Sequence, residues 1–188
     1  MQSDDHVFSR LAAYFDLLQR WNEKINLTSL TDGDEAVDRL IMEPLVAARF
    51  LPKGGAIVDV GSGGGSPAIP LAVALAAPIT MVESRGRKAA FLREVLRTLN
   101  LEGRVETDRA EALAARPELR RSAKVVSLRA VRMTAQLSSA LAELVADDGV
   151  LAMFSKHSEA VPDRFRPAGA HSLIPATQSF LHRFVPIR

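Results

Sequence analysis

Residues 56–67, AIVDVGSGGGSP, decide the fold of this chain. The first five residues form a short apolar run, as expected for a buried strand. The glycines that follow allow positive φ and a close approach of the backbone to a neighbouring group. A helical run begins near residue 67, so the stretch predicts a strand, a tight turn and a helix. The free N–H groups at the start of such a helix can face a nucleotide-like ligand.

Downstream of this turn, β-rich runs alternate with helical runs. The candidate strands are residues 56–60, 79–83, 104–107, 124–127 and 150–154. The candidate helices are residues 67–76, 87–99, 109–115 and 133–145. Two further runs, 172–176 and 178–187, predict an antiparallel pair near the C-terminus. The alternation predicts an α/β fold of the Rossmann-like class, mostly parallel with an antiparallel C-terminal strand, and with helices on both faces.

The N-terminal part of the chain is predicted to be helical. Apolar residues at helical spacing indicate an amphipathic helix over about residues 8–21. A turn-rich segment follows, and Asp32 can cap a second helix that runs to about residue 50. Pro44 is expected to kink or interrupt this second helix.

Composition indicates a single globular unit. The chain has 188 residues, of which 47% are apolar and 24% charged, as in globular proteins of one domain. We expect a helical N-terminal cap over residues 1–53 and one compact α/β core over residues 54–188. Of the 24 basic residues, 19 are arginines, which permits nucleic-acid binding without demanding it.

Several classes of protein are excluded. Cysteine is absent and the four histidines are scattered, so we expect neither disulfides nor a metal site. No apolar run reaches the roughly 18 residues of a membrane span, and the first ten residues contain acids where a signal peptide has bases. We therefore expect a cytoplasmic protein with no membrane partner, and a monomer.

Asp59 and Ser66 distinguish between the possible cofactors of the glycine turn. Asp59 lies two residues before Gly61, where a carboxylate attracts the ammonium group of a methionine moiety but repels a pyrophosphate. Ser66 stands where a dinucleotide-binding fingerprint requires Gly or Ala. Both features favour S-adenosylmethionine over NAD. We expect the turn, with Gly61, Gly63 and Gly65, to contact this cofactor.

A second acid supports the same cofactor. Glu83 closes the second candidate strand, 18 residues after Gly65, and a carboxylate there can accept hydrogen bonds from both ribose hydroxyls. The segment 108–111 follows the third candidate strand, where folds of this kind bind adenine. Asp108 in that segment is either a ligand contact or simply the N-cap of the next helix.

Short segments along most of the chain match one known family. They are Trp21-Asn22, Asn26-Leu27-Thr28-Ser29, residues 59–70, Glu83-Ser84, Arg87-Lys88, Phe91-Leu92, Arg109-Ala110-Glu111 and Arg129-Ala130-Val131. In these segments the chain resembles the bacterial small-subunit ribosomal RNA guanine-N7 methyltransferases, also called the glucose-inhibited division protein B family. The Asn-Leu-Thr segment is the most discriminating part, since generic methyltransferases lack it.

The resemblance implies a seven-stranded class I methyltransferase sheet under a helical cap. It also implies S-adenosylmethionine as cofactor, and as acceptor a guanine N7 in the 16S ribosomal RNA of the small ribosomal subunit. The family's cofactor contacts match Gly61, Ser66, Ala110, Glu111 and Arg129. The fixed charge of Arg129, just past the fourth strand, could also meet the cofactor carboxylate or an RNA phosphate. For the RNA substrate, we expect contacts from Lys156, which matches a family lysine, and from Arg132.

Five positions depart from the family pattern. Leu40 replaces a histidine, Pro44 a serine, Ala68 a glycine, Lys124 an aspartate and His157 a glycine. We expect these positions on the substrate side of the site, where they would affect the acceptor more than the cofactor.

Methylation of guanine N7 needs no general base, because N7 carries a lone pair and no proton at neutral pH. We therefore predict no catalytic residue that transfers a proton. At this point three other functions stay open: methylation of another acceptor such as a small molecule, RNA binding without catalysis as an assembly factor, and NAD-dependent oxidoreduction. Asp59 and Ser66 disfavour the last.

Overall fold

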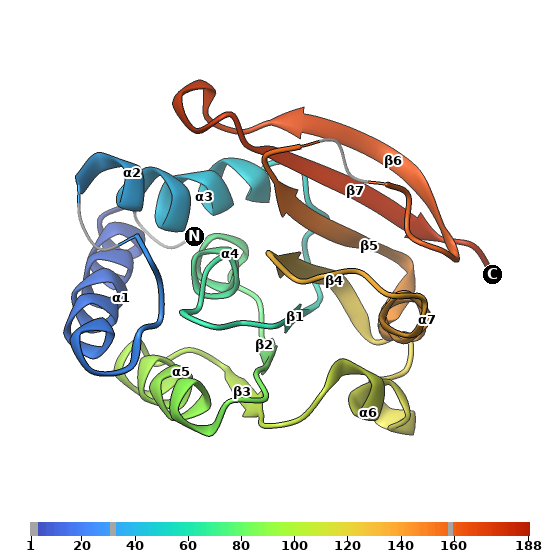
Figure 1. The fold of residues 1–188 in the computed structure, drawn as a ribbon, viewed down its shortest axis with the longest axis horizontal. Coiled ribbons are helices and arrows are strands. Elements are labelled where there is room, and N and C mark those ends of the chain that lie inside the picture. Colours follow the sequence, from blue (N-terminus) through green and yellow to red (C-terminus); the bar gives the residue numbers. More distant parts are fainter. Residues whose placement is uncertain (1–3, 31–32, 158–159) are drawn as a thin grey trace.

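The computed structural model describes residues 4–30, 33–157 and 160–188, which build one seven-stranded sheet in the order β3-β2-β1-β4-β5-β7-β6 (Figure 1). The strands are β1 (Ala56–Val60), β2 (Ile79–Val82), β3 (Gly103–Glu106), β4 (Ala123–Arg129), β5 (Val145–Ser155), β6 (Phe165–Ser172) and β7 (Phe180–Pro186). Neighbouring strands among β1 to β5 pair parallel, and β7 runs antiparallel to β5 and β6. The predicted sheet is thus confirmed.

Helices cover both faces of this sheet. They are α1 (Asp4–Ile25), α2 (Gly33–Val37), the π-helical turn η1 (Asp38–Met42), α3 (Glu43–Ala48), α4 (Ala68–Leu75), α5 (Gly86–Thr98), α6 (Ala110–Ala114) and α7 (Ala135–Leu144), with 3₁₀ turns η2 (Pro117–Leu119) and η3 (Pro175–Thr177). Successive residues of a strand point to opposite faces of the sheet. Ile57 packs against the face covered by α1, α4 and α5, and Val58 packs against the face covered by α6 and α7.

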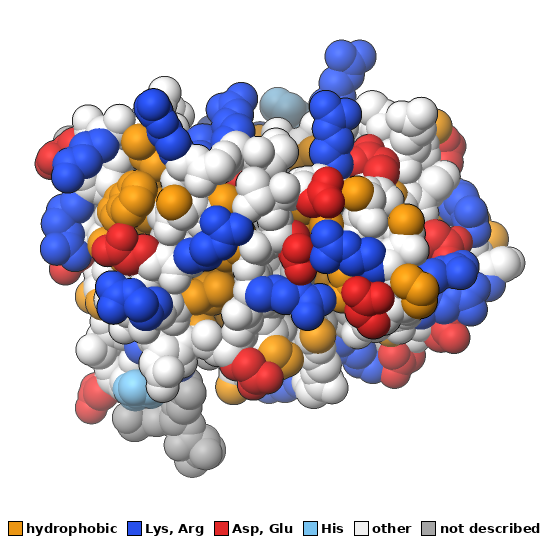
Figure 2. All heavy atoms as spheres, turned by 90° about the horizontal axis from the view of Figure 1, so that it is seen from below, with side chains coloured by type: hydrophobic (Ala, Val, Ile, Leu, Met, Phe, Trp, Pro, Cys, Tyr) orange, Lys and Arg blue, Asp and Glu red, His pale blue; other side chains and the backbone are white. Residues whose placement is uncertain are grey.

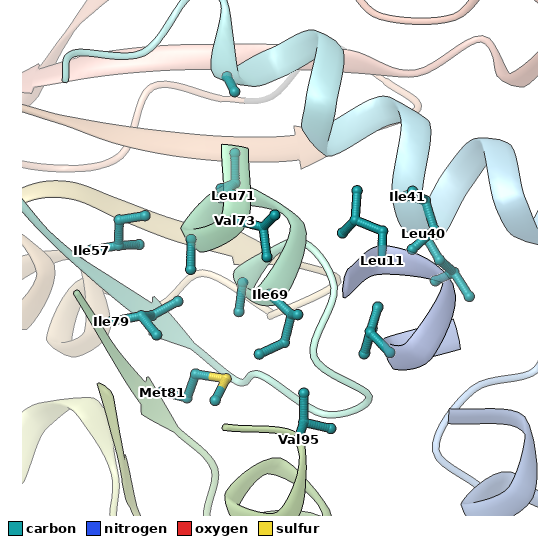
Figure 3. Close-up of a cluster of buried hydrophobic side chains, with 14 of the residues drawn as sticks. Leu11, Leu40, Ile41, Ile57, Ile69, Leu71, Val73, Ile79, Met81 and Val95 are labelled. Carbon is teal, nitrogen blue, oxygen red and sulfur yellow. The ribbon is translucent and has the colours of Figure 1, made fainter. Parts of the chain in front are cut away.

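The N-terminal helices belong to the main core. Figure 3 shows Leu11 of α1 and Leu40 and Ile41 of η1 in the same apolar cluster as Ile69 and Val73 of α4. The predicted cap is therefore packed against the α/β core rather than held by a linker.

Both N-terminal helices differ in detail from the prediction. α1 extends to Ile25 and ends where Asn26 adopts a left-handed φ of 46°, a conformation that asparagine tolerates. The second helix is continuous over residues 33–48, and the interruption expected at Pro44 takes the form of the π-helical turn just before it. The predicted cap residue, Asp32, lies outside the described residues.

The prediction of a strand over residues 172–176 was wrong. The partner of the last strand is β6, which ends at Ser172, and Pro175 instead opens the turn η3. β6 is an edge strand in which Phe165 is the one buried residue. Because the other side chains are exposed or half-buried, β6 has no apolar run that a sequence pattern can detect.

The topology opens a crevice at the carboxyl ends of β1 and β4. The chain leaves β1 towards β2 on one side, and β4 lies on the other side, so the loops that follow β1 and β4 diverge. Ligands of open α/β sheets bind at such a switch point. In the described parts of the chain, no helix is both long and apolar enough to cross a membrane.

Candidate active site

Three hollows adjoin one another at the carboxyl ends of the strands. The cap hollow, of about 280 Å³, is lined by Leu27, Thr28, Arg39, Leu40, Gly61, Gly63, Ser66, Arg129 and Val131. The Glu83 hollow, of about 290 Å³, is lined by Gly61, Glu83, Asp108, Ala110, Glu111, Val131 and Arg132. The Lys156 hollow, of about 230 Å³, is lined by Arg39, Arg129, Val131, Phe154 and Lys156. Val131 lines all three hollows, Gly61 joins the cap hollow to the Glu83 hollow, and Arg129 joins the cap hollow to the Lys156 hollow. One elongated ligand can therefore span them.

Gly61 forms the junction between the cap hollow and the Glu83 hollow. Its φ is 72°, and the N–H groups of Gly61 and Ser62 both donate to the carbonyl of Val82, at 2.9 and 3.1 Å. A Cβ at position 61 would lie 2.6 Å from a methyl group of Val131. The turn therefore needs glycine here both for its backbone conformation and for the close approach of the loop that follows β4.

Glu83 braces the glycine turn. One carboxylate oxygen accepts from the N–H of Gly63 at 2.9 Å, and the other accepts from the N–H of Arg85 at 2.8 Å. The side chain is 7% exposed, so its orientation is fixed from two sides. A carboxylate has about four lone-pair sites, which leaves acceptor capacity toward the Glu83 hollow for a ribose diol.

Asp59 lies beneath the site rather than on its surface. The residue is 1% exposed, and one carboxylate oxygen accepts from the hydroxyl of Ser127 at 2.5 Å. Burial raises the pKa of Asp59 to about 6, and the hydrogen bond from Ser127 opposes this shift. Asp59 lines none of the three hollows, so it could act on a ligand there only through its electric field or through a water molecule.

Gly65 also lies below the hollows and packs against α1. Its φ is 89°, and a Cβ there would lie 3.2 Å from the ring of Tyr14. The buried Tyr14 hydroxyl donates to the carbonyl of Gly64 at 2.7 Å. Burial raises the pKa of Tyr14, so the hydroxyl stays protonated and can donate. The N-terminal cap thus holds the glycine turn directly.

Arg129 is held from the second helix. Its Nη1 donates to the carbonyl of Arg39 at 2.5 Å, and its Nη2 donates to a carboxylate oxygen of Glu43 at 2.9 Å. The guanidinium lies 4.9 Å from the ring centroid of Phe154, within cation–π range. Ala130, the next residue, has a φ of 55°, a strained conformation of the kind often found at functional sites.

The structure brings most of the predicted site residues together. Gly61, Gly63, Ser66, Glu83, Ala110, Glu111, Arg129, Arg132 and Lys156 all line the three hollows, whereas Asp59 and Gly65 support them from below. Asp108 is not the N-cap of α6, which is Arg109 without a side-chain cap. Asp108 lines the Glu83 hollow instead.

Sequence reasoning missed four residues of the site: Tyr14, Arg39, Glu43 and Ser127. Tyr14 and Glu43 are polar residues in otherwise apolar helix faces, and this signal could have identified them. Nothing in the local sequence marks Ser127 or Arg39.

The expectation that all five family departures lie on the substrate side was wrong for Lys124. Lys124 begins β4 at the opposite end of the sheet, beside Gly55 and in an ion pair with Asp148. Leu40 does line the cap hollow. Because parallel strands present their amino ends to the other edge, a residue at the start of β4 cannot reach the site.

The molecular surface carries charges of both signs. Figure 2 shows one face on which Lys and Arg side chains are interspersed with Asp and Glu. The formal net charge is +2, and on this face the positive charge is spread rather than gathered in one patch.

The donor chemistry of the site fits S-adenosylmethionine. A fixed carboxylate stands at the tip of β2, where a ribose diol needs an acceptor, and the backbone of Gly61 lines two adjoining hollows. With a 3-2-1-4-5-7-6 sheet, these features define a class I S-adenosylmethionine-dependent methyltransferase. Solved structures share the fold: a mutant of MtNAS in complex with S-adenosylmethionine (TM-score 0.62, 13% identity, 95% of this chain and 75% of that one) and geranyl diphosphate methyltransferase with GPP and sinefungin (TM-score 0.57, 11% identity, 76% and 78%).

The sequence comparisons identify the family. The sequence model of GidB, described as rRNA small subunit methyltransferase G, matches residues 8–164. A ribosomal RNA small subunit methyltransferase G from Gluconobacter oxydans is 36% identical over 171 residues, which are 89% of this chain and 86% of that protein. A protein of the same name from Xanthomonas axonopodis is 45% identical over 116 residues, or 60% of this chain and 54% of that one. The chain belongs to the GidB family and is an S-adenosylmethionine-dependent methyltransferase.

Proposed function

We propose that this chain transfers a methyl group from S-adenosylmethionine to N7 of a guanine in the 16S ribosomal RNA of the small subunit. The observation that carries the proposal is the junction of the three hollows at Gly61, Arg129 and Val131. The buried carboxylate of Glu83 on the donor side and the basic side chains of Arg39, Arg129 and Lys156 on the acceptor side meet there. The relatives' shared name supports ribosomal RNA as the class of acceptor. We further propose that the protein acts as a cytoplasmic monomer.

The proposed donor occupies two of the hollows. Its ribose would bind Glu83, with the adenine beside Ala110 and Glu111, in the Glu83 hollow. Its methionine part would cross Gly61 into the cap hollow, above the buried Asp59. When bound, the cofactor supplies a methyl group already activated on a sulfonium.

The proposed acceptor approaches from the Lys156 hollow. Lys156 and Arg132 are both exposed, and neither forms an ion pair within the described part of the chain. Free cations of this kind bind RNA phosphates, which position the target base. Arg39 lines both the cap hollow and the Lys156 hollow, and so it stands between the donor and acceptor sides.

The chain's contribution to the chemistry is positioning. N7 of guanine needs no base, so the residues must hold N7 in line with the methyl group and keep water out. The walls suit this task because Leu27, Leu40 and Val131 give the junction an apolar lining.

The test is methyl transfer from labelled S-adenosylmethionine to small ribosomal subunits from a strain without its own enzyme of this family. Nucleoside analysis should find labelled 7-methylguanosine. Glu83→Gln should abolish both donor binding and transfer, because the amide loses an acceptor and the negative charge.

A matched pair of lysine variants tests the acceptor side. Lys156→Ala should raise the KM for the subunits with donor affinity unchanged. Lys53→Ala changes an exposed lysine before β1 and should change neither quantity.

Donor binding without label in RNA would reject the proposed acceptor. Transfer to small molecules would then favour another substrate, and RNA binding without turnover an assembly factor. Sedimentation velocity tests the monomer.

A further inference from the structure

The π-helical turn η1 changes the backbone hydrogen bonding of the second helix. The N–H of Glu43 donates to the carbonyl of Asp38, five residues back, whereas in an α-helix it would donate to Arg39. The next residue, Pro44, has no N–H. Pro44 therefore cannot donate to the carbonyl of Leu40, four residues back, as in an α-helix. Nor can it donate to the carbonyl of Arg39, five residues back, as in a π-helix. Two successive carbonyls are thus released from their α-helical bonds, and that of Arg39 from its π-helical bond as well.

Both released carbonyls bind residues of the active site. The carbonyl of Arg39 accepts from Arg129 Nη1 at 2.5 Å, and the carbonyl of Leu40 accepts from the hydroxyl of Ser66 at 2.8 Å. Arg129 is the last residue of β4, and Ser66 lies in the glycine turn. One helical turn therefore contacts two segments that are far apart in sequence. Turns of this π-helical kind occur frequently at functional sites.

Glu43 adds a charged contact from the same turn. Its side chain is 1% exposed and pairs with Arg129 Nη2 at 2.9 Å. The second carboxylate oxygen of Glu43 is buried, and no hydrogen-bond partner for it is found among the described residues. Arg129 is therefore the main compensation for this buried negative charge. Removal of either partner would leave the other charge buried and unpaired.

We propose that residues 38–44 form a positioning turn that sets Arg129 and Ser66 in place before the methyl donor binds. The carbonyls of Arg39 and Leu40 and the carboxylate of Glu43 fix these two side chains at the wall of the cap hollow. Binding then needs little reorganisation of the wall. The inference rests on the proposed placement of the donor in the cap hollow. Glu43 and Pro44 are positioning residues, since neither lines the hollow.

Pro44→Ala is the decisive variant because it adds one N–H and removes no contact of the site. The new N–H can restore the α-helical bond to the carbonyl of Leu40, which draws this carbonyl toward the helix axis and away from the hydroxyl of Ser66. Alanine is the better residue in a helix interior, but loss of the buried proline ring offsets part of this gain, so the variant should stay folded with a melting temperature near that of the natural protein. We expect about five-fold weaker binding of S-adenosylmethionine, measured by calorimetry well below the melting temperature.

Two controls separate positioning from a general structural effect. Pro117→Ala makes the same change at the exposed start of η2, away from the hollows, and should leave donor affinity unchanged. Ser66→Ala should weaken donor binding in the natural background but have little further effect when combined with Pro44→Ala, because the reoriented carbonyl of Leu40 no longer holds the side chain of residue 66. Such non-additivity reports the Ser66–Leu40 contact itself.

The outcomes are distinct from those for the proposed acceptor. The readout is donor binding, so rejection of ribosomal RNA as acceptor would not alter it. Unchanged donor affinity in Pro44→Ala, or additive effects of Pro44→Ala and Ser66→Ala, would overturn the positioning turn and leave the acceptor proposal as it stands. Weaker affinity in a folded Pro44→Ala variant together with a non-additive cycle would establish it.

Discussion

Asp59 is a buried residue whose charge near neutral pH depends on its surroundings. Burial raises its pKa from 3.8 to about 6, so the folded chain binds more protons than the unfolded chain between these two values. The free energy of unfolding therefore falls as pH rises through this window, and ionised Asp59 opposes folding at neutral pH. This cost is what a cofactor ammonium group could offset.

The first prediction concerns Asp59→Asn. At 1.36 kcal/mol per pKa unit, removal of the charge should raise the free energy of unfolding at pH 7.5 by roughly 3 kcal/mol at most, measured in urea. Donor affinity should be lower in this variant than in the natural protein. In the natural protein, donor affinity should decrease further when the pH is lowered to 5.5, whereas in Asp59→Asn it should not change with pH. Asp16→Asn, an exposed acid of α1, is the control and should change neither quantity. Asp59→Asn with full donor affinity would show that the carboxylate has no role in binding.

Gly61 allows a comparison between two glycines of similar backbone conformation. Gly61 has a φ of 72° and would bring a Cβ within 2.6 Å of Val131, whereas Gly54 has a φ of 76° and would meet nothing within 4 Å. Each alanine variant should lose about 1 kcal/mol of stability from the left-handed backbone. The stabilisation of the protein by added S-adenosylmethionine, measured by thermal unfolding, should disappear in Gly61→Ala and persist in Gly54→Ala. Equal responses would mean that the clash with Val131 is relieved without cost to the site.

At the scale of elements, α1 acts as a support for the glycine turn. The hydroxyl of Tyr14 reaches the carbonyl of Gly64 across 50 residues of sequence. Tyr14→Phe keeps the ring and removes this donor. We expect a loss of about 1 kcal/mol in stability and weaker donor binding by several-fold. Thr177→Val is the control, because it removes a hydroxyl that donates to the carbonyl of Ile174 at the turn η3. Its stability should fall, and its donor affinity should stay unchanged. Unchanged donor binding in Tyr14→Phe would show that packing alone holds the turn.

At the scale of the whole molecule, the cap and the α/β core share one apolar cluster. Leu11 and Leu40 of the cap belong to the same cluster as Ile69 of α4 and Ile57 of β1. The boundary between residues 1–53 and 54–188 is therefore a feature of sequence, and we propose that it does not separate two folding units.

Thermal unfolding tests this last prediction. The chain has one tryptophan, Trp21, whose ring centroid lies 5.7 Å from that of Phe91 on α5. Its fluorescence reports the docking of the cap, and far-ultraviolet circular dichroism reports the helices and the sheet. We expect coincident transitions, as in two-state unfolding. A fluorescence transition at lower temperature, or a stable fragment of residues 54–188, would show that the cap unfolds separately.

The sequence by itself determined the parallel strands β1 to β5, the glycine turn and the acid at the end of β2. Buried parallel strands are short apolar runs, and their carboxyl ends must meet at one edge, so Asp59, Glu83 and Arg129 could be assigned to that edge from their positions in the chain. The same reasoning failed for β6, because an edge strand with mostly exposed side chains carries no such pattern.

Only the tertiary structure decided which residues support the site. Tyr14, Glu43 and Ser127 contact Gly64, Arg129 and Asp59 across 50, 86 and 68 residues of sequence. Such contacts depend on how the helices pack on the sheet, and no local spacing encodes them. The role of Pro44 is of the same kind: sequence predicted an interruption of the helix, but only the folded chain shows that the carbonyls released there bind Arg129 and Ser66.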